Sequence, residues 1–121
     1  MGGFDDEQWM YAEDLDLGWR MREAGWTFLY AGAARVVHRA GSASGQAFGP
    51  DEGRLLVSRS YYDWLRRRLG RARCTAIGLI NQAGCLARAI VLRLARREEQ
   101  AERWRVRART DREALGWTRG G

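Results

Sequence analysis

A chain of 121 residues is long enough for one domain, or for part of a domain with an appendage, and too short for several. Its hydrophobic content of 45% is that of a globular protein and excludes a wholly disordered chain. The 21 basic residues are all arginine and exceed the 15 acidic residues, which gives a net charge of +6.

This charge is divided unevenly along the chain. Residues 1–53 carry four arginines and nine acidic residues, a net charge of −5, whereas residues 54–121 carry seventeen and six, a net charge of +11. A strongly basic segment is expected to meet an anionic partner. The candidates are a lipid headgroup surface, a nucleic acid and the acidic first half of the same chain. Nucleic acid is the weakest of them, because no helix-turn-helix, zinc or RNA-recognition pattern accompanies the charge.

The first distinctive stretch is YAEDLDLGWR at 11–20, where three carboxylates lie at the start of a helical pattern. A turn-like segment precedes it, and the apolar spacing followed by Gly25 predicts a short helix over 13–24. Aromatic and β-branched residues then predict two short strands, at 26–30 and 34–38. A helix followed by short strands fits the closing part of an α/β sheet.

The three carboxylates have two alternative explanations. Glu13 and Asp14 fall at the helix start, where free backbone N–H groups and the helix dipole favour anions. Asp16 and Arg20 are four residues apart and can pair on one face. A carboxylate held ionised in this way suits a general base. Alternatively, the acids only reflect the ordinary preference of acidic residues for helix starts.

A loop is predicted at 40–53, where glycine and serine are frequent and the only proline, Pro50, occurs. We place the domain boundary here, with an α/β part at 1–50 and a basic helical extension at 51–121. Beside an active site such a loop can act as a flexible lid. A plain linker has the same composition.

Two to three amphipathic, arginine-rich helices are predicted from residue 51 onward, so the chain is expected to be mostly helical overall. The first ends at Gly70, and its apolar face is formed by Leu55, Tyr62, Leu65 and Leu69. A final charged stretch over 97–112 is expected to form a solvated helix that frays, with no order expected beyond Trp117.

The second of these helices is predicted over 71–97, and one stripe of it is apolar. The stripe consists of Ile77, Ile80, Ala83, Ala87, Ile90, Val91 and Leu94. The uncharged run 74–87 is shorter than the ~20 residues that span a bilayer, and Arg88 and Arg93 follow it, so no transmembrane span is expected. Arginines beside an apolar face are typical of a helix lying on a membrane surface. Packing against a partner subunit would give the same pattern.

Two cysteines, Cys74 and Cys85, lie about 16 Å apart along the same predicted helix and cannot form a disulfide there. They are expected to be reduced, small apolar residues. The N-terminus has no basic stretch followed by an apolar one, so no signal peptide is expected. A cytoplasmic location follows, with peripheral attachment to the inner face of the membrane as an option.

Several anchors around the acidic stretch occur together in one order. They read GGFDD–x3–MYAEDLDLGWRMREAGW–x3–Y–x5–VVH, which is residues 2–38, within a stretch of about residues 2–45. This run resembles the C-terminal part of the catalytic domain of family 2 glycosyltransferases of the rhamnosyltransferase-like kind. The resemblance implies a fragment of a GT-A, Rossmann-like fold. It also implies an inverting transfer of a sugar from a nucleotide-diphosphate donor to an acceptor hydroxyl, in the synthesis of cell-surface polysaccharide or another glycan.

The resemblance assigns roles to individual residues. Asp14 matches the family's general base, and Glu13 and Asp16 match the flanking acids, which we expect to orient the acceptor. Arg20 matches a basic position and is expected to hold Asp16, a structural role. His38 matches a histidine that in some members binds the divalent metal, Mg²⁺ or Mn²⁺, at the donor diphosphate. A lone histidine at a strand end is also compatible with a structural role, and an imidazole alone cannot hold such an ion.

The main departure from the family pattern is the absence of its N-terminal half. The nucleotide-binding repeats and the Asp-x-Asp metal motif do not precede the helix, and Asp14-Leu15-Asp16 belongs to the base motif. We therefore expect this chain to bind no cofactor by itself, to ligate the metal incompletely and to be inactive alone. In the complete enzyme the expected partners are a nucleotide-sugar donor and a glycan or lipid-linked acceptor. The alternative is a non-catalytic, arginine-rich helical adaptor that docks on a membrane surface or a protein through 71–97.

Overall fold

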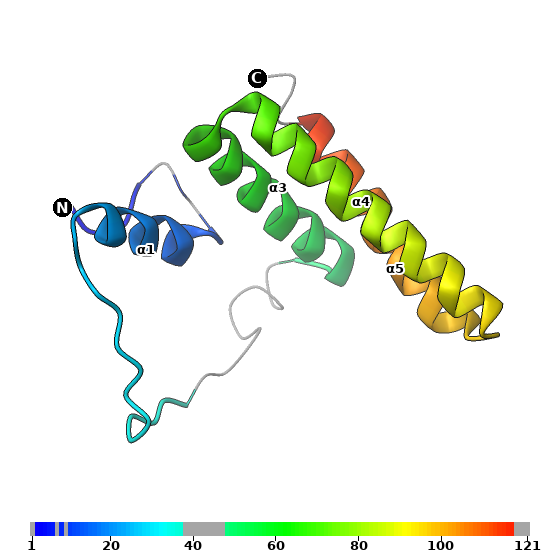
Figure 1. Ribbon diagram of the computed structural model, residues 1–121, viewed down its shortest axis with the longest axis horizontal. Coiled ribbons are helices and arrows are strands. Elements are labelled where there is room, and N and C mark those ends of the chain that lie inside the picture. Colours follow the sequence, from blue (N-terminus) through cyan, green and yellow to red (C-terminus); the bar gives the residue numbers. More distant parts are fainter. Residues whose placement is uncertain (1, 7, 9, 38–47, 118–121) are drawn as a thin grey trace.

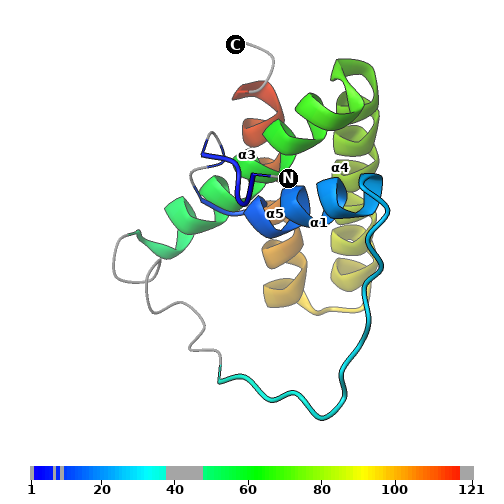
Figure 2. The ribbon, with the colours of Figure 1, turned by 90° about the vertical axis from the view of Figure 1, so that its left-hand side faces the viewer.

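The computed structural model describes residues 2–6, 8, 10–37 and 48–117. This part of the chain contains four α-helices, which are α1 (Glu13–Glu23), α3 (Pro50–Leu69), α4 (Arg71–Leu94) and α5 (Glu98–Trp117). Helices α3, α4 and α5 pack together as a bundle, and α1 lies against one side of it (Figures 1 and 2). The expectation that the chain is mostly helical agrees with this arrangement.

The hydrophobic core lies where α3 meets the ends of α4 and α5. Tyr62 and Leu65 are buried on the apolar face that the sequence predicts for α3, and Leu55 and Leu69 are packed beside them. Gly70 separates α3 from α4 and has a φ of 83°, a left-handed conformation that glycine adopts without steric cost. With this conformation, Gly70 alone separates the end of α3 at Leu69 from the start of α4 at Arg71.

Helices α4 and α5 approach closely because small residues line their contact. The buried residues of α4 are Cys74, Gly78, Gln82, Cys85 and Ala89. Those of α5 include Ala101, Ala108 and Ala114. The apolar stripe that the sequence predicts for α4, by contrast, is largely exposed. Ile80, Ile90 and Leu94 are 70%, 60% and 80% exposed. The small residues, rather than the large aliphatic ones, therefore form the inner face of α4.

The prediction for the C-terminal segment was wrong in one respect. It expected a solvated, fraying helix over 97–112, whereas α5 continues to Trp117 and packs along α4 (Figure 1). Ala101 and Ala114 are completely buried, and Leu115 belongs to the core. Most charged residues between these positions are at least partly exposed, Asp111 excepted, and their number hides the small buried residues from a prediction based on hydrophobicity.

Helix α1 is attached to α3 by an aromatic contact. The indole rings of Trp19 and Trp64 meet edge to face, with ring centroids 5.7 Å apart and planes at 78°. This geometry is a favoured one for aromatic pairs. Ala12, at the start of α1, is also part of the buried core.

The predicted α/β fold class is wrong for the part of the chain that the structure describes. Residues 26–37 follow α1 as a segment that runs away from the bundle, turns at 32–33 and forms no strand (Figure 1). Leu29, Tyr30 and Val37 are at least 90% exposed. A strand requires a neighbouring strand for its backbone hydrogen bonds, and no segment among the described residues lies beside 26–37 to provide one.

The close approach of α4 and α5 makes Gly78 sensitive to substitution. A Cβ atom at this position would lie 2.6 Å from Cδ2 of Leu115, which is itself buried. We expect Gly78→Ala to lower the free energy of unfolding by about 1–2 kcal/mol, because the cost of overpacking exceeds the gain in helix propensity.

Gly53→Ala provides the control for this measurement, because Gly53 is also helical and a Cβ atom there meets nothing within 4 Å. It should raise the free energy of unfolding by up to about 1 kcal/mol. Urea unfolding followed by circular dichroism measures both variants. Equal effects of the two substitutions would contradict the tight contact at Gly78.

Candidate active site

The turn that leads into α1 has a strained backbone. Tyr11 and Ala12 have φ values of 61° and 62°, in the left-handed region that non-glycine residues rarely adopt. Hydrogen bonds from outside the turn hold it: Gln8 Nε2 donates to the Tyr11 carbonyl at 2.7 Å, and the Ser60 hydroxyl donates to the Met10 carbonyl at 2.7 Å. Such conformations are costly and cluster at functional sites.

Helix α1 begins directly after this turn without a side-chain cap. Ala12 occupies the N-cap position and offers no oxygen to the first backbone N–H groups. The first turn therefore keeps the partial positive charge of a helix N-terminus without a neutralising contact from the N-cap side chain. Glu13, Asp14 and Asp16 all lie in this turn, as the sequence predicts.

The three carboxylates have different environments. Asp14 is exposed, and its Oδ1 accepts a hydrogen bond of 2.8 Å from the Leu15 backbone N–H. Glu13 is partly buried, and its Oε2 is covered without a hydrogen-bond partner among the described residues. Asp16 is only 1% exposed. An acceptor molecule could reach Asp14, whereas Asp16 is enclosed by protein.

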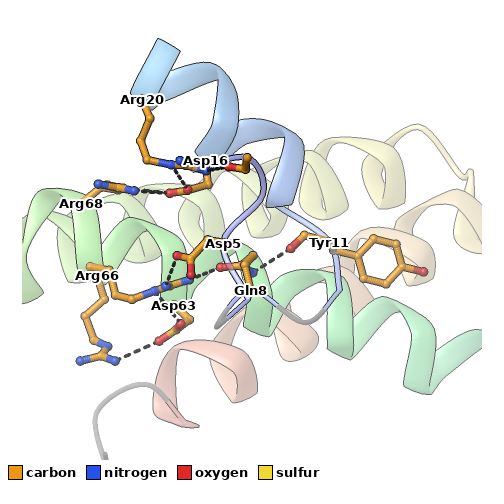
Figure 3. Close-up of polar contacts among 10 residues, drawn as sticks. Asp5, Gln8, Tyr11, Asp16, Arg20, Asp63, Arg66 and Arg68 are labelled. Atoms are coloured by element: carbon orange, nitrogen blue, oxygen red, sulfur yellow. Dashed lines mark hydrogen bonds and ion pairs between the residues drawn. The ribbon is translucent and has the colours of Figure 1, made fainter. Parts of the chain in front are cut away.

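Two arginines enclose the carboxylate of Asp16 (Figure 3). Arg20 Nε donates to Oδ2 at 2.7 Å, and Arg68 donates to Oδ1 through Nε at 2.9 Å and Nη2 at 2.5 Å. Burial by itself raises the pKa of Asp16. The hydrogen bonds and positive charges of Arg68 and Arg20 oppose this effect and leave the pKa below its ordinary value. Asp16 therefore stays ionised and joins α1 to α3.

The predicted pair between Asp16 and Arg20 is thus present, and the sequence analysis missed its third member. Arg68 lies 52 residues from Asp16 in the chain, so no local spacing rule points to it. Arg20 also donates through Nη2 to the Gly3 carbonyl at 2.6 Å, which fastens the N-terminal segment to α1. We expected Asp16 to orient the acceptor, but the arginines occupy both of its oxygens, and its contacts are structural.

A second set of polar contacts fastens the N-terminal segment to α3 beside the first (Figure 3). Arg67 pairs with Asp5 at 3.3 Å and with Asp63 at 3.1 Å, and it donates to the side-chain oxygen of Gln8. Together with Arg68, this arginine joins the basic half of the chain to the acidic half. The acidic first half is therefore one anionic partner of the basic helices. It was one of the three candidate partners that the charge distribution suggested.

A cavity of about 850 Å³ lies between the start of α1 and the three bundle helices. Its walls combine aromatic rings, aliphatic groups and a few polar side chains. The lining residues from α1 and the preceding turn are Tyr11, Ala12 and Leu15, and those of the bundle include Tyr61, Asn81, Arg88, Trp104 and Asp111. The guanidinium of Arg88 lies over the Trp104 ring, 5.0 Å from its centroid. A mixture of this kind is typical of small-molecule sites.

Asp111 is a carboxylate in this cavity that the sequence analysis did not single out. It is 4% exposed, accepts a hydrogen bond of 3.3 Å from the Ser58 hydroxyl, and lies 3.7 Å from Arg107 Nε. Burial raises the pKa of Asp111, and Arg107 and Ser58 only partly oppose this effect. A buried carboxylate with a raised pKa in a cavity is typical of functional sites. The sequence could have indicated this residue only through its position, as an acid on the buried side of α5.

Comparison with known proteins connects part of this chain to a sugar-transferring enzyme. Forty-six residues, 38% of the chain, are 44% identical to N-acetylglucosaminyl-diphospho-decaprenol L-rhamnosyltransferase of Mycobacterium tuberculosis, in strains CDC 1551 and H37Rv. The match covers 15% of each relative, so the chain spans only a small part of their length. No protein-family model matches, and no solved structure does.

These matches support a glycosyltransferase relationship in coarse form. Their length is close to that of the segment 2–45, on which the sequence resemblance rests. They do not establish the fold or the specific reaction that the family resemblance implies. The division at residue 50 stays a prediction, as do the roles of Glu13 and Asp14.

The described residues do not provide a complete divalent-metal site. They contain no group of three or more histidine, cysteine or acidic side chains that could hold an ion. Among the acids of α1, Asp16 already has both oxygens bonded to arginine. His38, the expected metal ligand, lies outside the residues that the structure describes.

The buried ion pairs of Asp16 should control the stability of the chain. We expect Asp16→Asn to lower the free energy of unfolding by about 2–3 kcal/mol, because it leaves two arginines without their counter-ion; both are partly solvated, which reduces the loss. In the wild-type chain, the contribution of ionised Asp16 to the free energy of unfolding should be present above pH ~4. It should be lost as pH falls through the lowered pKa of Asp16. Urea unfolding from pH 2 to 7 measures it.

Asp14→Asn is the matched control on the same helix turn. Asp14 is exposed, and asparagine preserves an oxygen for the Leu15 N–H, so its effect should stay within about 0.5 kcal/mol at every pH. Equal losses for the two variants would show that Asp16 has no special structural role.

Asp111 should have the opposite pH dependence. Because its pKa is raised in the folded chain, the stability that it contributes is complete below pH ~4 and is lost as pH rises through the folded pKa. We therefore expect Asp111→Asn to raise the free energy of unfolding at pH 7 by about 1 kcal/mol, and this gain to vanish at low pH. A constant or negative effect from pH 3 to 7 would exclude a strained carboxylate in the cavity.

Proposed function

We propose that this chain contains the acceptor-side catalytic segment of an inverting glycosyltransferase, with Asp14 as the general base. The observation that carries the proposal is the position of Asp14. It is exposed at an open helix N-terminus, and the buried Asp16–Arg68 contact holds that helix in place within a sequence related to a rhamnosyltransferase.

The proposed reaction requires one proton transfer on the acceptor side. The carboxylate of Asp14 accepts the proton of an acceptor hydroxyl while the hydroxyl oxygen forms a bond to the anomeric carbon of the donor sugar. The bond between that carbon and the diphosphate oxygen breaks on the opposite face, and the nucleoside diphosphate leaves. Attack from the opposite face inverts the configuration at the anomeric carbon.

The neighbouring groups have supporting roles in this proposal. Glu13 is partly buried beside Asp14 and is proposed to orient the acceptor, as the sequence resemblance implies. Asp16 and Arg20 position the helix and do not touch the substrate. The cavity beside Ala12 and Leu15 is the nearest space in which part of an acceptor could bind.

The donor side of the reaction is proposed to lie outside these residues. The described helices contain no strand–helix repeat of the kind that binds nucleotides at the ends of parallel strands, so the chain alone is proposed to be inactive. In the whole enzyme we propose a nucleotide-sugar donor, a glycan or lipid-linked acceptor, Mg²⁺ or Mn²⁺ at the diphosphate, and a cytoplasmic location.

A chimaeric enzyme tests the role of Asp14. The mycobacterial rhamnosyltransferase is replaced, from the start of its matching 46-residue segment onward, by this whole chain, so that Arg68 still contacts Asp16, and rhamnosyl transfer to the acceptor of that enzyme is measured. We expect the chimaera to be active and Asp14→Asn to lower its kcat by about 10²- to 10⁴-fold, because no other group takes the proton.

Glu23→Gln is the control within the same helix, because Glu23 is exposed at the C-terminal end of α1. It should leave kcat unchanged within about twofold. An active chimaera in which Asp14→Asn and Glu23→Gln have equal kcat values would contradict the proposed base.

A further inference from the structure

The outward face of α4 is an unbroken apolar surface. From residue 76 to residue 94 it extends for about 27 Å along the helix axis. Its members are Ala76, Leu79, Ile80, Ala83, Leu86, Ala87, Ile90, Val91 and Leu94, all exposed. We call these nine residues the α4 face. Large aliphatic side chains on a solvated helix face are uncommon and indicate an interaction surface.

By length and composition alone, α4 would qualify as a membrane-crossing helix. Its packing opposes that orientation, because the other side of the helix lies along α5 (Figure 1). α5 carries many charged residues, including Glu99, Arg103 and Arg109, whose side chains are at least 75% exposed. These charges would enter the hydrocarbon together with α4 if it crossed a bilayer in this fold, at high cost.

The charges within α4 all have the same sign, and beyond its end Glu98, the first residue of α5, lies 4.0 Å from Arg93 Nε. The helix contains four arginines and no acidic residue. Arg71 and Arg73 lie at its start, and Arg93, Arg96 and Arg97 at its end, and all five are exposed. Arginines at both ends of an apolar face are placed to contact anionic headgroups while the aliphatic side chains enter the boundary of the acyl chains.

The same arrangement opposes pairing of this face with a second copy of the chain. In an antiparallel pair, Arg71 and Arg73 would lie beside Arg93, Arg96 and Arg97 of the other copy. In a parallel pair, each end would lie beside its own duplicate. Either register would bring like charges together along an apolar contact, which is unfavourable.

We propose that the α4 face docks on the surface of an anionic membrane, with the helix axis parallel to the bilayer plane. The aliphatic side chains enter the interface, and the arginines at the two helix ends bind lipid phosphates. This inference does not depend on the proposed sugar transfer: it uses none of the residues of α1, and its tests leave unchanged Ile80, the member of the α4 face that lines the cavity.

Vesicle flotation of the full chain tests the proposal. Vesicles of phosphatidylcholine containing 30% phosphatidylglycerol should bind the chain at least tenfold more tightly than phosphatidylcholine alone, and high salt should weaken the binding. The triple variant Leu79→Ser, Ile90→Ser, Leu94→Ser should bind on the order of 100-fold more weakly. These side chains are exposed, so the helical content by circular dichroism should be unchanged.

Two control variants match these changes in number and chemistry. Leu29→Ser, Val36→Ser, Val37→Ser removes three exposed aliphatic side chains outside the bundle and should leave binding unchanged. Binding should weaken about tenfold or more in the triple variant Arg73→Gln, Arg93→Gln, Arg96→Gln, which removes arginines at the two ends of α4. Its control is the triple variant Arg22→Gln, Arg35→Gln, Arg54→Gln, which loses the same charge elsewhere in the chain and should have a smaller effect.

Three results would overturn the proposal. The first is no flotation with anionic vesicles. The second is flotation that the serine substitutions in the α4 face do not reduce. The third is a dimer, seen by light scattering after size exclusion, that the same serine substitutions dissociate and that does not float, because the face would then be an interface between copies.

Discussion

The ion pairs of the buried carboxylate of Asp16 are the constraint on which the arrangement of this chain depends. Helix α1 is short, and a helix of eleven residues has little stability of its own in water. Contacts from another part of the chain must hold it, and Arg68 of α3 provides two hydrogen bonds to Asp16. Arg20 adds a second charge to Asp16 and reaches the Gly3 carbonyl, so one carboxylate organises three segments.

Local sequence rules predicted what depends on nearby residues. Helix periodicity located α1, α3 and α4, and the spacing of four between Asp16 and Arg20 indicated their contact. The burial of Tyr62 and Leu65 also followed from periodicity. Each of these features depends on residues within a few turns of one helix.

Features that depend on distant residues could not be predicted in this way. Residues 26–30 have the composition of a strand, but composition does not reveal whether a neighbouring strand is available. The contact with Arg68 and the cavity around Asp111 bring together residues more than fifty positions apart. The inner face of α4 was misjudged for another reason: periodicity highlights large side chains, while Gly78, Cys85 and Ala89 make the contact because they are small.

The bridge between Asp16 and Arg68 has a consequence for any division of this chain. Its two halves differ in charge, and residue 50 is a natural place to cut them apart. A polypeptide ending there would nevertheless contain a water-excluded anion that has lost one of its two cations, and the remaining piece would expose Trp64 where Trp19 now covers it. We therefore expect the acidic segment and the basic helices to unfold as one cooperative unit, so that truncated or recombined forms of the chain should keep the two together.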